Sequence, residues 1–309
     1  MPRKLVSLFL QHSNPPFIPI PHFFGIKGGV GNPLGLYTLG RPVPVKALVL
    51  AAGEGRRLRP LTYDRPKPML PVGDRPLLEQ IIILLREHGI TEIAINLHYK
   101  PWVVVHHLGH GRRWGVRIHY SFEEHLLGSA GAARRLAWYF NDGPFLVFYG
   151  DLYTDLNVSE LVARHQQGDA LVTMALYEVE NPTACGIVEL DEGGRVTRFV
   201  EKPAPDQVFS RLANAGVFVV EPQVLDLIPP ETPYDFGRDL FPRMLAEGLP
   251  IQGHRIREML IDIGTLENYQ RAQMIAARRA RRVEAPRTRP ATNLSPTPTG
   301  HLAFIGGES

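Results

Sequence analysis

Cysteine is almost absent from this chain, because Cys185 is the only one among 309 residues. A single thiol excludes a disulfide within the chain and a zinc site built on several cysteines, and it suits a reducing compartment. Long apolar runs are missing as well, since no stretch approaches the roughly 20 residues that span a bilayer. Hydrophobic residues make up 44% of the chain and charged residues 21%, which is typical of a globular protein. We therefore predict a soluble, cytoplasmic protein with no membrane association.

Acidic residues are absent from the first 53 positions, and the net charge of +3 arises at the two ends. Residues 1–45 carry four basic residues and no acidic one, whereas residues 271–309 carry seven arginines against two glutamates. The stretch between these ends is consequently acidic. A nucleic-acid-binding protein needs positive charge on its folded part, so we expect no nucleic-acid partner.

The composition divides the chain into three parts. Residues 1–44 are rich in Pro and Gly and lack any apolar period, so we expect a disordered extension or translated sequence upstream of a start near Val43 or Val45. Residues 45–282 are expected to form one catalytic domain. Residues 283–309, rich in Pro, Thr and Gly, are expected to be a disordered tail.

From Lys46 onward, apolar strands alternate with helical patterns. The strands are predicted at 46–52, 92–96, 116–120, 145–149 and 170–177, and the helices at 77–88, 101–108, 130–140 and 158–167. This alternation predicts an α/β fold with a doubly wound, mostly parallel sheet. Short strands at 187–190, 196–201 and 214–220 then predict a small mixed sheet, and a last helix is predicted at 266–282.

A glycine-rich turn follows the first predicted strand. It reads Ala51-Ala52-Gly53-Glu54-Gly55-Arg56-Arg57, with Lys67-Pro68 a little further on. Glycines at the carboxyl end of a strand let backbone N–H groups approach phosphate oxygens, and the nearby basic side chains neutralise phosphate charge. The turn is neither a Walker P-loop nor a dinucleotide fingerprint, because Gly-Lys-Ser/Thr and Gly-x-Gly-x-x-Gly are absent. An ordinary strand-to-helix turn is the alternative.

Six motifs in order resemble those of the sugar-1-phosphate nucleotidyltransferases, also called nucleotide-sugar pyrophosphorylases. The first is the turn from Leu50 to Thr62 with the segment from Lys67 to Pro71. The other five are Leu127-Gly128-Ser129-Ala130-Gly131, Phe148-Tyr149-Gly150-Asp151, Phe199-Val200-Glu201-Lys202-Pro203, Asn214-Ala215-Gly216 and Asp262-Ile263-Gly264-Thr265. The resemblance extends from Lys46 to about Gln273, and it implies a Rossmann-like nucleotidyltransferase fold whose small mixed sheet binds the sugar.

The resemblance implies a reaction in which a nucleoside triphosphate and a sugar 1-phosphate give a nucleotide sugar and pyrophosphate. The segment from Tyr234 to Pro242 and the Asn214-Ala215-Gly216 segment are most similar to mannose-1-phosphate guanylyltransferases, which favours GTP and mannose 1-phosphate. UTP- or dTTP-dependent transfer to glucose 1-phosphate or another hexose phosphate stays an alternative. So do a non-catalytic regulatory relative that binds nucleotide sugars and an enzyme of the same fold that activates phosphocholine or an aminosugar. A homo-oligomer is also left open.

The resemblance also implies roles for single residues. Asp151 and Asp262 each follow an apolar strand and would bind Mg²⁺, the expected cofactor, although an Asp in that position can also be a helix N-cap. The expected catalytic residues are Arg57, Lys67, Asp151, Lys202 and Asp262. The expected nucleotide contacts are Ala51, Ala52, Gly53, Gly55, Arg57, Lys67 and Gly128, with the loop 96–99 bordering the base. The expected sugar-phosphate contacts are Gly186, Glu201, Lys202 and Asn214.

The sequence departs from the family pattern at three places. Arg56 stands where a Thr is usual, Cys185 stands where a Tyr often precedes the glycine, and the segment Met259-Leu260-Ile261 lacks the usual aromatic residue. None of these changes removes a charged group that the reaction requires.

Three histidines, His106, His107 and His110, lie close together in the sequence. Neighbouring side chains on a helix point in different directions, and we expect no carboxylate or cysteine to complete a metal site. We therefore expect solvated surface histidines.

Overall fold

The computed structural model describes residues 45–284. The predicted N-terminal extension and almost all of the predicted tail lie outside the described residues, so the three-part division of the chain stays a prediction. Within residues 45–284, no helix is long and apolar enough to cross a membrane.

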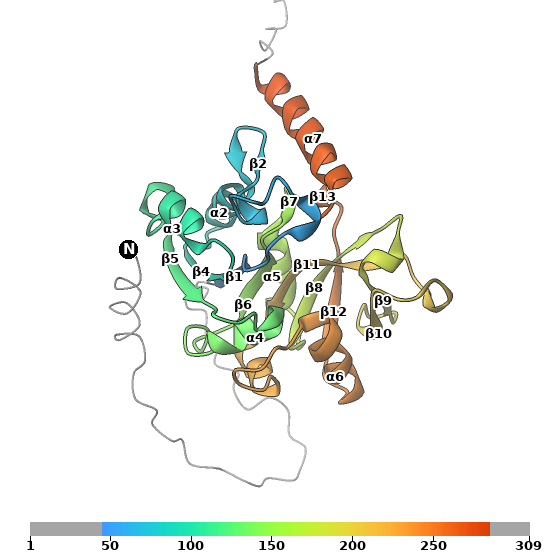
Figure 1. The fold of residues 1–309 in the computed structure, drawn as a ribbon. Coiled ribbons are helices and arrows are strands. Elements are labelled where there is room, and N and C mark those ends of the chain that lie inside the picture. The colour runs from blue at the N-terminus through green and yellow to red at the C-terminus, as the bar shows by residue number, and fades with distance from the viewer. Residues whose placement is uncertain (1–44, 285–309) are drawn as a thin grey trace, which may run out of the picture. The chain divides into compact units, whose positions relative to one another are not determined.

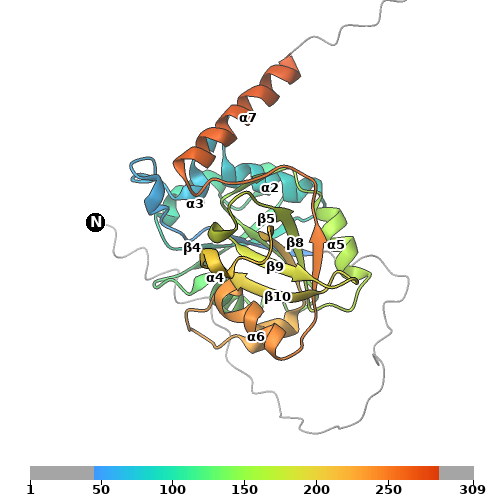
Figure 2. The ribbon, with the colours of Figure 1, turned by 90° about the vertical axis from the view of Figure 1, so that its right-hand side faces the viewer.

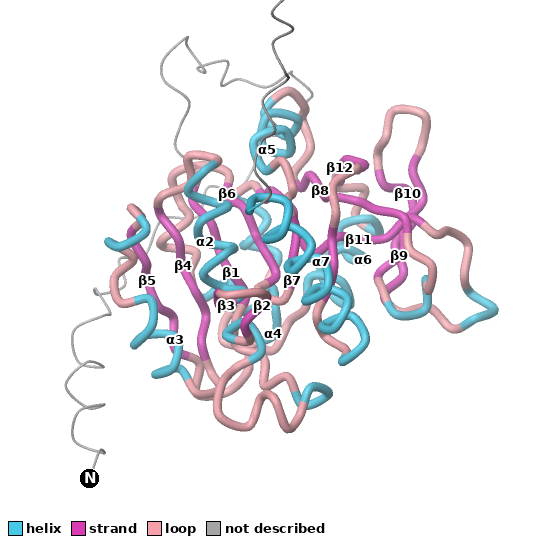
Figure 3. Tube along the Cα trace, turned by 90° about the horizontal axis from the view of Figure 1, so that it is seen from above, coloured by secondary structure: helices cyan, strands magenta, loops and turns pink. Residues whose placement is uncertain are grey.

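Four parallel strands form one end of a nine-stranded sheet. These are β1 (Lys46–Leu50), β4 (Glu92–Leu97), β5 (Arg117–Phe122) and β6 (Phe145–Tyr149), and they lie in the order β6-β1-β4-β5 (Figure 3). The chain runs from β1 through β4 to β5 and then returns to β6 on the other side of β1. The carboxyl ends of β1 and β6 therefore meet at a topological switch point, where ligands bind in open α/β sheets.

A long strand, β11 (Leu212–Val220), extends this sheet in the antiparallel direction. β11 pairs with β6 and, on its other side, with β8 (Val172–Glu178) and β9 (Gly186–Leu190). Two further strands complete the sheet, since β10 (Val196–Glu201) pairs with β9, and β12 (Ile251–Arg255) pairs with β8. The mixed part is thus continuous with the parallel part through β11, and Figure 2 shows its strands β9 and β10 side by side. The register between β11 and β8 shifts between Asn214 and Phe218.

Side chains of the central strands alternate between two apolar cores, as the pleat of a strand requires. In β1, Ala47 and Val49 point into one core and Leu48 into the other. The first core packs under α2 (Leu77–Glu87), α3 (Pro101–Leu108), α5 (Val158–Gln166) and α7 (Leu266–Glu284) (Figure 1). The second packs under α4 (Gly128–Arg135), α6 (Phe241–Ala246) and a π-helical segment (Phe236–Leu240). Helices on both faces confirm the predicted doubly wound α/β fold.

Several short elements differ from the sequence-based expectation. The structure contains a hairpin of β2 (Pro71–Val72) and β3 (Arg75–Pro76), and a two-stranded ladder of β7 (Leu152–Thr154) and β13 (Leu260–Asp262). Strands of two or three residues are too short to show a period of two, so no pattern predicted them. The helix predicted at 130–140 ends as α4 at Arg135 and continues as turns.

We expect Phe218→Ala to lower the free energy of unfolding by about 3–5 kcal/mol, because it empties the centre of the second core. Phe218 is fully buried and packs edge-on against Phe236 and Phe241, with ring centroids 4.7 and 5.3 Å away. Urea denaturation followed by circular dichroism measures the loss. Phe122→Ala is the matched control, since its ring is 43% exposed and its loss should stay below about 1 kcal/mol. Equal losses in both variants would contradict this packing.

Candidate active site

A cleft of about 230 Å³ opens where β1 and β6 end. Its wall is formed by Leu50, Ala51, Ala52, Gly53, Lys67, Pro68, Asn96, Glu123, Leu126, Gly128, Ser129, Tyr149 and Asp151. Residues from three of the six motifs therefore meet in one cleft at the topological switch point.

The turn after β1 is held by side chains from outside it. The Ala51 N–H donates to Asn96 Oδ1 at 2.8 Å, so this amide already has a partner within the protein. Gly55 has φ +66°, and a Cβ there would lie 2.9 Å from the Lys67 Cβ. Only glycine combines that backbone angle with so close an approach to Lys67. Thr62 Oγ1 donates to the Gly55 carbonyl at 2.9 Å and fixes the turn from the other side.

The extra arginine of the turn has a partner within the turn. Arg56 Nε and Nη2 donate to the two carboxylate oxygens of Glu54 at 2.8 and 2.9 Å. This contact lowers the pKa of Glu54. The positive charge that Arg56 adds to the family pattern is thus offset by the carboxylate of Glu54.

The two aspartates predicted to bind metal are brought together by the ladder of β7 and β13. Asp151 directly precedes β7, and Asp262 is the last residue of β13, opposite Leu152. The Ile263 N–H donates to the Asp151 carbonyl at 3.0 Å, which continues the ladder to the edge of the cleft. The Lys67 ammonium forms an ion pair with the Asp151 carboxylate.

The charges of this cluster act on one another strongly. Burial alone would lower the pKa of Lys67, but the carboxylates of Asp151 and Asp262 raise it overall, so the ammonium stays protonated. Burial and the negative charge of Asp151 raise the pKa of Asp262. Two carboxylates whose charges disfavour each other form a site that a cation stabilises.

Arg57 lies against the same cluster. A Cβ on Gly264 would lie 3.0 Å from Arg57 Nη2 and 2.8 Å from Asp262 Oδ1. The Gly264 N–H donates to Asp262 Oδ1 at 2.7 Å. The glycine after the last motif therefore leaves room for a guanidinium beside a carboxylate. Arg57, Lys67, Asp151 and Asp262 meet at one point of the structure.

Another group of predicted residues lies at the junction of β9, β10 and β11. Glu201 ends β10 opposite Gly186, and a Cβ on Gly186 would lie 2.6 Å from Glu201 Oε2. The Lys202 ammonium lies 3.7 Å from Glu201 Oε1, and its backbone adopts φ +49°. Burial raises the pKa of Glu201, whereas Lys202 acts in the opposite direction. Asn214 Oδ1 accepts the Gly216 N–H at 2.9 Å.

Cys185 lies within electrostatic reach of both groups of charged residues. Burial is the main cause that raises the pKa of its thiol; the contact with Tyr177 opposes this effect, and the charges of Asp262 and Glu201 add to it. The Tyr177 hydroxyl lies 3.9 Å from Cys185 Sγ.

Gly128 fixes the loop on the opposite side of the cleft. Its φ is +72°, and a Cβ there would lie 2.5 Å from the Tyr234 carbonyl oxygen. The Ala130 and Gly131 N–H groups donate to that oxygen at 2.9 and 3.0 Å. Ser129 Oγ donates to Asp235 Oδ2 at 2.6 Å. The segment from Tyr234 to Pro242 thus holds the loop at Gly128, which lines the cleft.

The donor set at Asp151 and Asp262 fits Mg²⁺. Mg²⁺ is typically bound by one or two carboxylates together with phosphate oxygens and waters. Within residues 45–284, no group of three or more His, Cys, Asp or Glu side chains could hold a metal ion by itself. A metal at this position would consequently depend on phosphate oxygens of a ligand as well as on the protein.

Three residues that line the cleft were not among the predicted contacts. Glu123, Ser129 and Tyr149 line it, and burial strongly raises the pKa of the Tyr149 hydroxyl. Glu123 could have been noticed, because it directly follows a strand whose carboxyl end lies on the ligand side of the sheet. Ser129 and Tyr149 each lie within a recognised motif, but no chemistry was assigned to them.

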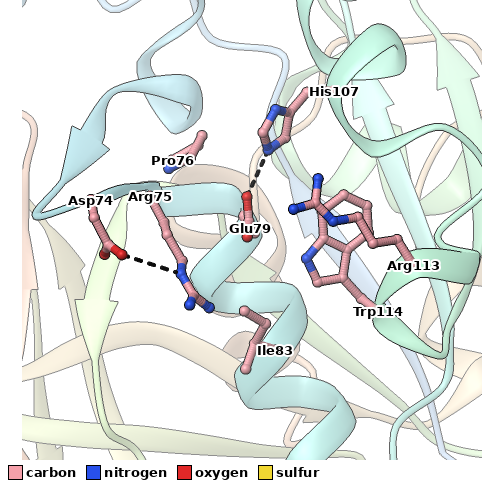
Figure 4. A pocket seen from close by; sticks show the side chains of 8 residues that line it. All are labelled: Asp74, Arg75, Pro76, Glu79, Ile83, His107, Arg113 and Trp114. Carbon is pink, nitrogen blue, oxygen red and sulfur yellow. Dashed lines mark hydrogen bonds and ion pairs between the residues drawn. The ribbon is translucent and has the colours of Figure 1, made fainter.

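A second cavity, of about 500 Å³, lies between α2 and α3 and contains none of the predicted site residues (Figure 4). His107 Nε2 contacts Glu79 Oε2 at 2.7 Å on its wall, and Glu79 is only 7% exposed. His107 is therefore a partly exposed histidine, 31% exposed at its side chain, that has a carboxylate partner rather than only solvent around it. The sequence could not show this contact, because Glu79 comes from a different helix.

Comparisons with known proteins agree with this arrangement. A family model described as nucleotidyl transferase matches residues 46–279. The chain is 35% identical over 256 residues to the UTP–glucose-1-phosphate uridylyltransferase of Synechocystis sp.. The aligned region covers 78% of this chain and 66% of that protein. It is 37% identical over 231 residues to the mannose-1-phosphate guanylyltransferase of Mycobacterium tuberculosis. This aligned region covers 74% of this chain and 63% of that protein. The chain spans slightly less than two thirds of the length of these two relatives.

The fold also matches solved structures. HddC from Yersinia pseudotuberculosis, complexed with GMP-PN, superposes with a TM-score of 0.64 at 23% identity. The match covers 75% of this chain and 99% of that chain. At this level of identity the likeness concerns the fold.

We expect Gly128→Ala to destabilise the protein by at least about 2 kcal/mol, because it adds a steric clash to the cost of a left-handed backbone. Gly89→Ala is the matched control: Gly89 follows the end of α2 with φ +79°, but a Cβ there would meet nothing within 4 Å. Its loss should stay at about 1–2 kcal/mol. Chemical denaturation of both variants measures the difference, and a smaller loss for Gly128→Ala than for Gly89→Ala would contradict the described contact with Tyr234.

Proposed function

Because the chain belongs to the nucleotidyl transferase family, we propose that it transfers a nucleotidyl group from a nucleoside triphosphate to a sugar 1-phosphate. A phosphate oxygen of the sugar 1-phosphate forms a bond to the α-phosphorus of the triphosphate. The bond from the α-phosphorus to the oxygen that bridges to the β-phosphorus breaks, and pyrophosphate leaves. The products are a nucleotide sugar and pyrophosphate.

The observation that supports this proposal most strongly is the meeting of four charged residues beside the glycine-rich turn. Arg57 and Lys67 supply positive charge, and Asp151 and Asp262 supply a pair of carboxylates. A reaction between two polyanions requires neutralisation and in-line placement more than covalent help from the protein. The charges of this arrangement support such a role.

Different residues bind the two substrates. Arg57 and Lys67 hold the triphosphate, with the backbone from Ala52 to Gly55 close to its oxygens. Lys202 holds the phosphate of the sugar. Glu201 and Asn214, together with the backbone at Gly186, bind sugar hydroxyls. Gly128 and the loop 96–99 border the base.

Mg²⁺ is the proposed cofactor, held by Asp151 and Asp262. When bound, it supplies further positive charge at the phosphate oxygens. The two aspartates hold their positions through the backbone ladder of β7 and β13, so the site does not depend on flexible side chains alone.

GTP and mannose 1-phosphate are the proposed substrates. The segment from Tyr234 to Pro242 supports this choice, and the M. tuberculosis relative carries the matching name. The Synechocystis relative is similar at nearly the same identity, so UTP or dTTP with glucose 1-phosphate is the alternative. A few contacts in the base and sugar subsites decide between these pairs.

The substrate proposal is tested by pyrophosphate release with Mg²⁺ across five triphosphates (GTP, UTP, dTTP, CTP and ATP) and the 1-phosphates of mannose, glucose and N-acetylglucosamine. We expect release only when one triphosphate and one sugar 1-phosphate are present together, and most rapidly with GTP and mannose 1-phosphate. Faster release with UTP or dTTP and glucose 1-phosphate would support the alternative pair. Binding of nucleotide sugars without release in any combination would overturn the enzymatic proposal in favour of a regulatory protein.

We expect Asp151→Asn to reduce turnover by at least about 100-fold, because it removes one of two carboxylates for the metal and the partner of Lys67. The melting temperature should change little, since the backbone ladder is preserved. Asp142→Asn is the matched control, because Asp142 is an exposed partner of Lys46 away from the cleft. Near-normal turnover of Asp151→Asn with added Mg²⁺ would refute the metal role of this residue.

A further inference from the structure

Two buried polar side chains connect the turn at residues 51–55, here called the phosphate turn, to the loop at residues 123–128, which contains Gly128 beside the proposed base and is here called the base loop. Asn96 lies near the end of β4 and is 3% exposed, and Glu123 directly follows β5 and is 5% exposed. Neither belongs to the charged cluster around Lys67. Their positions follow from the parallel register, which places Leu50, Asn96 and Ser121 side by side.

Three hydrogen bonds run through these side chains from one loop to the other. The Ala51 N–H donates to Asn96 Oδ1 at 2.8 Å. Asn96 Nδ2 donates to Glu123 Oε1 at 2.8 Å. The Leu127 N–H donates to Glu123 Oε2 at 3.0 Å. The Glu123 backbone is fixed as well, because its N–H donates to the Leu97 carbonyl at 2.8 Å and its own carbonyl accepts His98 Nδ1–H at 2.9 Å.

Burying an amide and a carboxylate is costly unless their hydrogen bonds are made, and a partly broken network costs more than an apolar pair. Each hydrogen bond of this network also has a defined donor and a defined acceptor. Its donors and acceptors match only when Ala51 and Leu127 keep their present positions. It therefore fixes where the phosphate turn and the base loop lie relative to each other.

We propose that Asn96 and Glu123 are positioning residues for the nucleoside triphosphate: they hold the phosphate turn and the base loop at the separation that one nucleotide spans. The inference rests on the proposed function, since it assigns the cleft to the nucleotide. Asn96 acts through the Ala51 amide, and Glu123 acts through the Leu127 amide. Neither residue contacts the sugar-phosphate subsite at Glu201 and Lys202.

The hydrogen-bond pattern allows a direct test by exchange of the two groups. In Asn96→Asp, two carboxylates face each other without a donor between them. In Glu123→Gln, one amide oxygen must serve two N–H donors. The double variant N96D/E123Q restores all three bonds, because the new glutamine amide donates to the new aspartate, accepts the Leu127 N–H, and leaves the Ala51 N–H its acceptor.

We expect each single variant to raise the KM for the triphosphate about 10- to 100-fold, the range of a lost buried hydrogen bond to a charged or unsatisfied group. The KM for the sugar 1-phosphate should stay within about 2-fold, because its subsite is not connected to the network. The double variant should recover most of the triphosphate KM. Isothermal titration with GTP, UTP and dTTP in the presence of Mg²⁺ measures affinity independently of turnover.

Thr173→Val is the matched control for a merely structural effect. Thr173 is fully buried and bonds His165 Nδ1 at 2.8 Å in β8, away from the cleft. Its loss should lower the melting temperature without changing either KM. The proposal would be overturned if the single variants bound the triphosphate as tightly as Thr173→Val does. It would also be overturned if the double variant bound the triphosphate no more tightly than the weaker-binding single variant.

The test separates this proposal from the proposed function. A wild-type protein that binds a triphosphate but forms no nucleotide sugar overturns the proposed reaction, and the binding affinities of the variants then decide on the positioning role. A wild-type protein that binds none of the three triphosphates overturns the positioning role.

Discussion

Repulsion between the carboxylates of Asp151 and Asp262 is the constraint to which the rest of the site responds. The backbone ladder of β7 and β13 fixes where the two backbones lie, because Asp262 is paired opposite Leu152, the residue after Asp151. The Gly264 N–H donates to the carboxylate of Asp262, and the Lys67 ammonium pairs with that of Asp151. The cations Lys67 and Arg57 offset the repulsion, and the glycines beside them allow the close approach.

Much of the fold was predictable because parallel strands buried on both faces form short apolar runs that are visible in the sequence. The predicted runs at 92–96 and 145–149 correspond to β4 and β6. The short strands β7 and β13 were not predictable, since their pairing depends on residues that are far apart in the chain. The predicted mixed sheet exists, but only the structure shows that β11 makes it continuous with the parallel sheet.

The candidate site was predictable where a motif carries a charge or a glycine with an evident physical role. Lys67 and Asp151 came from separate motifs and form an ion pair in the structure. The proximity of Asn96 to Glu123 could not be predicted from spacing, because the register of two parallel strands decides it. The contact of His107 with Glu79 was missed for a similar reason, since packing between two helices creates it. The roles assigned to all these residues in binding and turnover stay predictions.

The register shift in β11 lies between the two groups of charged residues. β11 is a single strand that pairs with β6, next to Asp151, and with β8 and β9 in the mixed part of the sheet. The shift falls between Asn214 and Phe218, and it contains Gly216 with φ +73°. A shift of this kind leaves residues of one strand unpaired and bends the strand locally. The strand that carries Asn214 thus pairs further along with the strand that leads to Asp151, so one continuous strand and its local bend set the distance between the two groups.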